Sequence, residues 1–281
     1  MPVLALIVLA ALAGGVLSAL AAAFTLALGP AWIPRLVSFA VGALLGAVFL
    51  ELVPHALEIA DAHHVMVVML IGLLGFFLLE KLVLWRHSHG HETHDDAADE
   101  SEHDHAMHAR AVPAGRGAGP GAGHDHDHDH DHGRSGLMIL IGNGVHNFCD
   151  GIVIAASFLA DPALGLAATL AIVAHAVPQQ IGDFAVLVHS GYTRQRAFVT
   201  NIASGCATPL GALAAYFALA GMQQALPTVL AIAAASLLYV AVADLIPSLH
   251  RRPEPIETAK QSALIGAGIG VIALVHALLA H

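Results

Sequence analysis

The sequence predicts an all-α, polytopic membrane protein with eight transmembrane helices. Composition is the first reason: 57% of the 281 residues are hydrophobic, only 11% are charged and the mean hydropathy is +0.73, far from the values of a soluble domain. The second is that eight apolar stretches can each cross a hydrocarbon core of about 30 Å as a helix. The third is an internal repeat. The predicted spans cover residues 3–27, 36–57, 65–85, 137–160, 164–188, 198–219, 225–249 and 262–280.

The basic residues lie in alternate connections between these spans. The first, third, fifth and seventh connections, with the span ends beside them, hold all 11 Lys and Arg, whereas the others hold Glu58, Asp61 and Asp161 and no basic residue. Because basic connections stay in the cytosol, both termini are predicted to lie outside it. The Ala-rich sequence with short outer connections suggests a bacterial inner (cell) membrane. The basic residues are Arg35, Lys81, Arg86, Arg110, Arg116, Arg134, Arg194, Arg196, Arg251, Arg252 and Lys260.

The chain divides into four regions. Residues 1–85 hold spans 1 to 3, residues 86–136 form a long connection, residues 137–189 hold spans 4 and 5, and residues 190–281 hold spans 6 to 8. The connection carries twelve of the 21 His residues among many Asp and Glu residues, and it has too little apolar surface to fold alone. We expect a disordered cytosolic loop that binds zinc, copper or nickel with little selectivity. A solubilising linker is the alternative.

An internal repeat links the first and last thirds of the chain. Residues 19–24 resemble residues 212–217, and the segment Glu51-Leu-Val-Pro54 resembles Asp244-Leu-Ile-Pro247 at the same offset of 193 residues. Because spans 1 and 6 run in opposite directions, this is an inverted repeat of spans 1 to 3 and 6 to 8 with spans 4 and 5 between them, a 3+2+3 arrangement. Such repeats are typical of secondary transporters with a binding site near the midplane.

Polar residues at helical spacing mark spans 4 and 5. His146 and Asp150 lie four residues apart on span 4, and His175 and Gln179 lie four apart on span 5, so each pair shares one helix face. At about 1.5 Å per residue, both pairs fall near the middle of the membrane. Ionisable groups at that depth are costly and usually mark a substrate pathway. Four N and O ligands suit a divalent cation, so the pattern predicts a metal site shared by the two antiparallel spans.

Span 2 carries a second set of polar residues. Glu51 lies near the midplane, and His55 follows one turn later, closer to the outer face. There it joins further polar residues that form either an entrance attracting cations or an acidic, solvated helix end: Glu58, Asp61, His63 and His64.

Other polar residues within the spans have two interpretations each. Glu51 and its repeat equivalent Asp244 either hydrogen-bond for packing or accept protons, since buried carboxylates in membranes are rarely idle. Asp183 and His189 lie toward the cytosolic end of span 5 and suggest a metal exit route. For Asp183, a structural hydrogen-bond acceptor is the alternative. No function is predicted for His276 near the end of span 8. The two cysteines, Cys149 and Cys206, are predicted to be small core residues without a disulfide.

The segments HNFCDG at 146–151 and HAVPQQIGDF at 175–184 resemble the paired signatures of the ZIP (Zrt-, Irt-like) family of divalent metal transporters. The resemblance covers nearly the whole chain and implies eight spans, outer termini and a His-rich loop between spans 3 and 4. It also implies import of zinc, iron, manganese or a related cation by movement of a bundle of spans 1, 4, 5 and 6. By this resemblance the primary site holds His146, Asp150, His175 and Gln179, and a neighbouring second site involves Asn147 and Gln180.

The chain departs from the family pattern on span 5. That pattern reads H-E-x-P-x-E, and Ala176 and Gln180 stand where the two glutamates would be. Carboxylates normally offset the repulsion between two dications in a paired-metal site. With Asp150 as the sole central carboxylate, the sequence predicts one metal ion at a time.

Several functional alternatives stay open at this point. A cation-diffusion exporter also uses His-x-x-x-Asp pairs, although six spans are usual there; a non-transporting metal-binding relative and an intramembrane zinc hydrolase are further alternatives. We expect a transporter, not an enzyme, with the metal as cargo and no prosthetic group. The expected partners are the metal ion and the lipid bilayer, without nucleic acid, and a homodimer stays open.

Overall fold

A computed structural model describes residues 3–20, 32–88, 132–219, 221–250 and 254–279 of the chain. Within these ranges there are helices and no strands, so the all-α prediction is confirmed. Three of the segments, η1, η3 and η5, are π-helical. The elements are α1 (Val3–Leu12), η1 (Ala13–Leu17), α3 (Ile33–Gly46), η3 (Ala47–Leu52), α4 (Val53–Ile59), α5 (Ala62–Ser88), α6 (His132–Ala160), α7 (Pro162–His189), α8 (Arg194–Gly205), α9 (Ala207–Leu219), the 3₁₀ turn η4 (Gln223–Ala225), α10 (Leu226–Tyr239), η5 (Val240–Leu245), α11 (Ile246–Leu249) and α12 (Pro255–Leu279).

Seven helical segments in the described part of the chain are long and apolar enough to cross a membrane. They match seven of the predicted spans, and α6 corresponds to the remaining one. At 29 residues α6 is about as long as its neighbour α7, which has 28. The eight-span count therefore stays a prediction, with α6 as the eighth candidate. Most of the His-rich connection, residues 89–131, lies outside the described residues.

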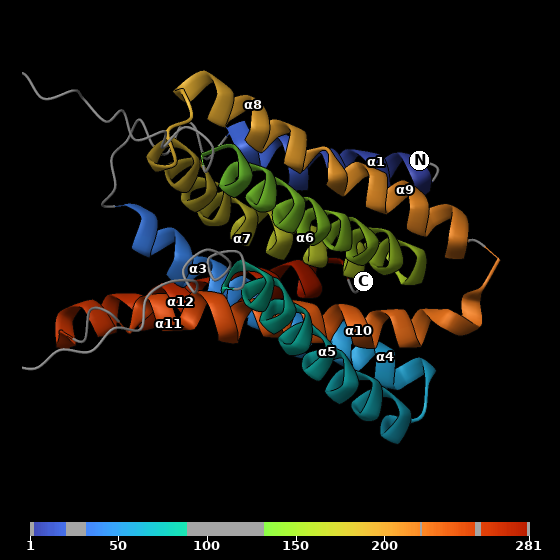
Figure 1. Ribbon diagram of the computed structural model, residues 1–281. Helices are drawn as coiled ribbons and strands as arrows, with labels where there is room; N and C mark the ends of the chain where they lie inside the picture. Colours follow the sequence, from blue (N-terminus) through green and yellow to red (C-terminus); the bar gives the residue numbers. More distant parts are fainter. Residues whose placement is uncertain (1–2, 21–31, 89–131, 220, 251–253, 280–281) are drawn as a thin grey trace, which may run out of the picture.

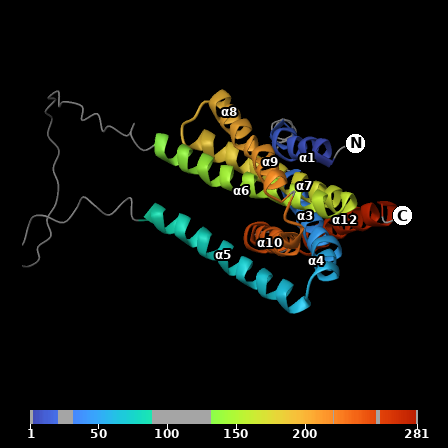
Figure 2. The same cartoon turned by 90° about the vertical axis from the view of Figure 1, so that its right-hand side faces the viewer.

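The helices form two groups (Figure 1). One group holds α1, α6, α7, α8 and α9, and the other holds α3, α4, α5, α10, α11 and α12, with α3 packed along α12 and α10 along α5. In Figure 2, turned by 90°, α1 and α9 again lie on the side opposite α5. The groups meet where α3 and α12 contact α7 and where α10 contacts α6. The predicted metal ligands are on α6 and α7, close to this junction.

The element boundaries recur along the chain at the offset found in the sequence. The starts of α3, η3, α4 and α5 at residues 33, 47, 53 and 62 recur 193 residues later as the starts of α10, η5, α11 and α12 at residues 226, 240, 246 and 255. The packing recurs too, because α3 on α12 is the repeat equivalent of α10 on α5. This double recurrence supports the inverted repeat. The π-helical segments η3 and η5 are among the elements that recur at this offset. A π-helical turn inside an α-helix is rare and often lies at a functional position.

Small residues allow α6 and α9 to pack closely. A Cβ atom at Gly151 would collide with the carbonyl oxygen of Thr208, and one at Gly211 would collide with that of Phe148. Only a residue without a side chain permits such a close backbone approach. Since Gly151 directly follows Asp150, this contact also fixes where the carboxylate lies.

Capping and breaking residues set the helix ends. Asp161 caps α7, its Oδ1 accepting hydrogen bonds from the backbone N–H groups of Ala163 and Leu164 at 2.7 and 3.2 Å, and Pro162 at the first helical position needs no hydrogen bond there. Thr193 caps α8 in the same manner. The extended backbone of Ala60 separates α4 from α5. These short corners place antiparallel neighbours side by side.

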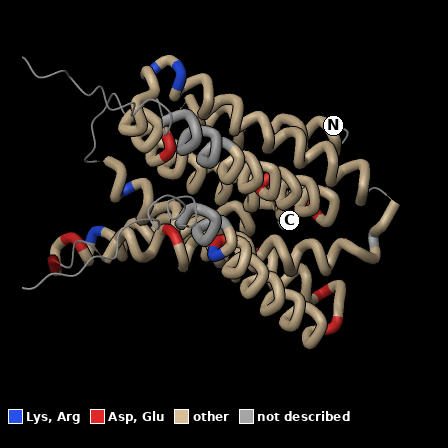
Figure 3. The backbone as a smooth tube through the Cα atoms, viewed as in Figure 1, with Lys and Arg blue, Asp and Glu red and all other residues tan. Residues whose placement is uncertain are grey.

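Charged residues separate between the two ends of the bundle. Figure 3 shows Lys and Arg gathered at the end where α3 and α8 begin, and acidic residues without basic ones at the opposite end of the described chain. Between the ends, α5 and α12 are largely exposed apolar helices. An apolar exposed surface flanked by charged ends suits a lipid environment.

Candidate metal transport site

Three predicted ligands from α6 and α7 converge in the interior. His146 Nε2 lies 3.3 Å from His175 Nε2 and 3.5 Å from Asp150 Oδ2, and His175 Nε2 lies 3.4 Å from the same oxygen. Among the described residues, this His146–Asp150–His175 triad is the one group of His, Cys, Asp and Glu whose ligand atoms are close enough to hold a metal ion.

The distances within the triad match one metal geometry. In a tetrahedral zinc site with ligands at about 2.0–2.1 Å, neighbouring ligand atoms are separated by about 3.3–3.4 Å. The three observed separations of 3.3, 3.4 and 3.5 Å are therefore close to three edges of such a tetrahedron. The triad has the dimensions of one tetrahedral face, and a fourth ligand would complete it.

Local helix structure orients both imidazoles. His146 and Asp150 are four residues apart on α6, which places them on the same face. On α7, His175 Nδ1 lies 3.1 Å from the carbonyl oxygen of Ala171, to which it donates a hydrogen bond. With its proton on Nδ1, the His175 ring presents an unprotonated Nε2 to the triad, as is usual for metal-binding histidines.

The triad is buried, and one of its polar atoms has no partner. His175 is 0% and Asp150 2% exposed, whereas the His146 side chain is 21% exposed. Asp150 Oδ1 has no hydrogen-bond partner within the described chain. A buried, unpaired carboxylate oxygen beside two imidazoles is costly, and a divalent cation is the ligand that best offsets that cost.

The triad is closed on one side. Toward the end where α6 stops and α7 starts, Ile154, Ala171 and Ile172 are fully buried. On the other side, toward the start of α6, Gly142 is exposed and Asn143 and Asp183 are half-buried. Half-buried polar residues therefore lie toward the start of α6, and packed apolar side chains lie on the other side of the triad.

Other predicted site residues have different surroundings. Gln179, one turn after His175 on α7, is half-buried. Asn147 donates a hydrogen bond to Ser204 Oγ of α8 at 2.8 Å, and Gln180 donates one to the carbonyl oxygen of Gly15 in η1 at 3.3 Å. The two amides therefore connect the central helices to the outer members of their own group.

Glu51 is buried in the second group and is not part of the triad. Its two carboxylate oxygens lie 3.1 and 3.2 Å from Nδ1 of His276 on α12. No role was predicted for His276, because nothing in its local sequence reveals that α12 packs against η3. His55 on α4 lies 3.9 Å from Glu58. Asp183 is half-buried on α7, where its side chain pairs with that of Asn143 on α6.

Two further findings differ from the sequence-based expectations. Tyr239 donates a hydrogen bond to Glu80 between α10 and α5, a pair that sequence reasoning missed because it joins residues far apart on two apolar helices. Cys206 is exposed at the junction of α8 and α9 and Cys149 is half-buried, so the prediction that both are core residues was wrong for Cys206. Both are free thiols, as predicted.

Comparisons with known proteins identify the family of this chain. The family model of the ZIP zinc transporters matches residues 2–276. Zinc transporter ZIP13 of Mus musculus is 28% identical over 263 residues, which cover 87% of this chain and 70% of that protein, and ZIP13 of Homo sapiens is 28% identical over 272 residues, covering 87% and 71%. Zinc transporter ZIP4 of Homo sapiens is 36% identical over 118 residues, 42% of this chain and 18% of that protein. Since the family match spans nearly the entire chain and includes both helices of the triad, the chain belongs to the ZIP zinc transporter family.

Proposed function

We propose that this protein imports divalent metal cations, zinc foremost, into the cytosol through the His146–Asp150–His175 triad. The observation that carries the proposal is the set of separations of 3.3–3.5 Å between the three ligand atoms, which suits tetrahedral zinc. Iron, manganese, cobalt and cadmium are secondary candidates, because His and Asp ligands bind several divalent ions and availability then decides. Gln179 is the proposed fourth ligand.

We infer that the site carries one ion at a time. Ala176 and Gln180 replace the two glutamates of the family pattern, Gln180 is engaged with Gly15, and Asn147 is engaged with Ser204. A second dication nearby would face the first with no added negative charge, and repulsion between unit charges alone is already about 4 kcal/mol at 4 Å for an effective dielectric constant of 20.

The proposed orientation places the basic end of the bundle in the cytosol and both termini outside, in a bacterial inner membrane. In that orientation the side of the triad closed by Ile154, Ala171 and Ile172 faces outward and the side with Asp183 faces the cytosol. Asp183 is a candidate exit residue, His55 a candidate entrance residue, and Glu51 a buried residue whose pairing with His276 suggests a packing role.

The two groups of helices suggest how access alternates. The triad belongs entirely to the group of α1, α6, α7, α8 and α9. A displacement of this group along α3, α10 and α12 would move the bound ion from one side of the membrane to the other without breaking the triad.

The proposal is tested by uptake of metal into vesicles of known orientation that contain a metal-sensitive dye. We expect zinc flux in the direction that corresponds to import, and a loss of at least about a hundredfold in Asp150→Asn and His175→Ala, because each leaves a buried group unpaired and removes a ligand. His250→Ala, which removes an exposed imidazole directly after α11, is the matched control and should transport normally. Flux in the export direction, or unchanged flux in the triad variants, would contradict the proposal.

A further inference from the structure

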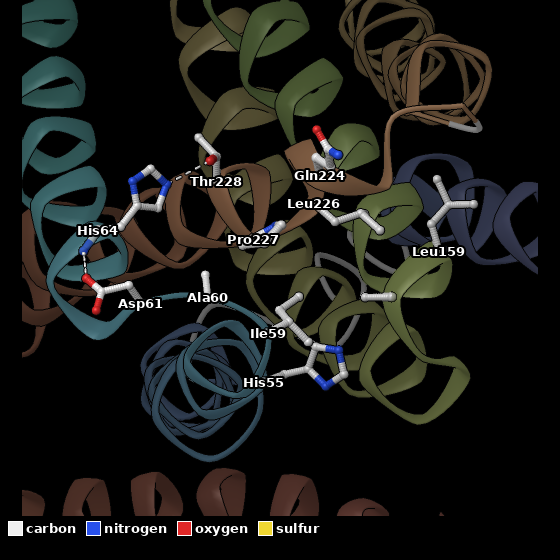
Figure 4. Close-up of a pocket in the computed structure, with 11 residues that line it drawn as sticks. His55, Ile59, Ala60, Asp61, His64, Leu159, Gln224, Leu226, Pro227 and Thr228 are labelled. Carbon is white, nitrogen blue, oxygen red and sulfur yellow. Dashed lines mark hydrogen bonds between the residues drawn. The ribbon is translucent and has the colours of Figure 1, made fainter.

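A cavity of about 610 Å³ lies at the acidic end of the bundle, away from the triad. Figure 4 shows that its walls come from four places: α4, the corner before α5, the end of α6 and the start of α10. The polar side chains lining it include His55, Asp61, His64 and Thr228, and the apolar ones include Leu159 and Ala160. The cavity combines imidazole and carboxylate groups with a mostly apolar wall.

Fixed contacts hold two of these polar groups in place. Asp61 Oδ2 accepts a hydrogen bond from the backbone N–H of His64 at 3.1 Å, which caps the first turn of α5. The His64 ring shares a hydrogen bond between Nε2 and Thr228 Oγ1 at 3.0 Å, joining α5 to α10. Neither contact uses Asp61 Oδ1 or His64 Nδ1. The His55 side chain, which Figure 4 shows on another wall of the cavity, is 25% exposed. These groups are positioned, and each keeps an atom that can bind a ligand.

The surrounding charge favours a cation. Glu58 and Asp61 lie at this corner, Asp161 directly follows the lining residue Ala160, and the acidic end carries no Lys or Arg in the described part of the chain. A cleft with apolar walls and one sign of charge concentrates counter-ions and raises the rate of their capture. An anionic ligand would find no basic group here.

We infer that this cavity is an outer vestibule that captures a hydrated divalent cation of borderline softness before transport. The inference rests on the proposed orientation, which places the vestibule outside the cell. The ligand atoms are too widely spaced to bind one ion directly, since only the triad forms a compact group in the described chain. An ion with six water molecules occupies roughly 180 Å³, at about 30 Å³ per water, and therefore fits. Imidazole favours zinc, cobalt and nickel over magnesium and calcium.

The vestibule and the triad both include residues of α6, but they lie at different depths along this helix. Asp150 and the lining residue Ala160 lie on this helix about 15 Å apart, at 1.5 Å per residue. Between them, Val153, Ile154 and Ala156 are buried, so the cavity does not reach the triad in this conformation. A cation held in the vestibule would wait there until the α6 group moves.

The vestibule is tested by the kinetics of zinc uptake in the full-length protein. We expect His55→Ala, His64→Ala and Asp61→Asn each to raise KM about three- to tenfold at low ionic strength while leaving the maximal rate unchanged, because a steering site affects capture and not translocation. The change Asp61→Asn keeps the helix cap, since Asn and Asp cap equally well. His63→Ala is the matched control. The sequence grouped His63 with the candidate entrance residues, but its exposed imidazole at the same corner does not line the cavity, so the inference predicts an unchanged KM.

The outcomes separate this inference from the proposed function. If the wild-type protein carries no zinc, the proposed function fails. If it carries zinc and KM does not rise in the three variants, the vestibule is overturned, as it also is if His63→Ala raises KM to the same degree. Melting temperatures of the variants show whether each one folds. If His55→Ala or His64→Ala does not fold, Asp61→Asn still tests the vestibule.

Discussion

His175 shows how a single residue combines packing with chemistry. It is fully buried, its Nδ1 donates to the carbonyl oxygen of Ala171, and its Nε2 faces both His146 and Asp150. The helix itself supplies the group that fixes the ring, because the carbonyl lies four residues earlier on α7. A ligand that is positioned before the ion arrives requires less reordering when the ion binds.

Ala176 and Gln180 allow the single-ion proposal to be tested at the residue scale. The double change Ala176→Glu and Gln180→Glu adds two carboxylates beside the triad, so we expect the number of zinc ions bound per chain to rise from about one to about two, or the affinity to rise. The measurement is calorimetric titration of purified protein that lacks residues 89–131, because zinc binding predicted for this His-rich segment would add to the signal. Unchanged stoichiometry and affinity would count against the proposed ligand set.

The same double change has a structural cost that serves as an internal check. Gln180 is 3% exposed and donates to the carbonyl oxygen of Gly15, and a carboxylate at this position cannot donate. We expect a loss of stability of about 1–3 kcal/mol from this change, seen as a lower melting temperature without metal and partly recovered with zinc. Ala176→Glu alone leaves the Gln180 contact intact and separates the two effects.

At the scale of elements, close helix packing positions the triad. The Gly151→Ala change places a methyl group against the carbonyl oxygen of Thr208, so we expect α6 and α9 to separate, stability to fall by about 1–3 kcal/mol, and transport to fall because Asp150 is the preceding residue. Gly144→Ala on the same helix meets no atom within 4 Å and should be neutral or stabilising, by up to about 1 kcal/mol. Melting curves and uptake rates of both variants are the measurements, and equal behaviour would contradict this role of Gly151.

The elements also show what the sequence could and could not predict. Hydropathy alone indicated each helix, and depth arithmetic indicated that His146, Asp150 and His175 converge, because the helical rise is constant and the connection between α6 and α7 is short. The π-helical turns η3 and η5 could not be predicted, since no local residue pattern distinguishes them from α-helix. Partners far apart in the chain, Glu51 with His276 and Glu80 with Tyr239, depend on how whole helices pack and have no local signal.

At the scale of the whole molecule, the proposed inverted repeat bears on how the proposed transport could alternate between two states. The helices α3 and α5 of the first half correspond to α10 and α12 of the second at one offset, so the contact of α3 with α12 recurs as the contact of α10 with α5. In a structure with such symmetry, exchange of the conformations of the two halves converts an inward-facing state into an outward-facing one. The triad lies on α6 and α7, the two helices outside the proposed repeat, so the proposal predicts that both states share it.

The His-rich connection adds a further property of the whole molecule, and it gives the last prediction. Residues 89–131 hold most of the twelve His residues of this connection, while the triad lies on α6 and α7. Deleting this segment should therefore leave KM and the initial rate of zinc uptake unchanged, since neither the triad nor the proposed vestibule is altered. As a cytosolic metal binder, the segment should instead change how flux responds to accumulated zinc, so the deletion variant should differ from wild type in vesicles preloaded with zinc on the cytosolic side. A variant in which these His residues are replaced by Ser keeps the length of the connection and should behave like the deletion. If the deletion lowers the initial rate and the Ser variant does not, the connection acts through its length and not through metal binding.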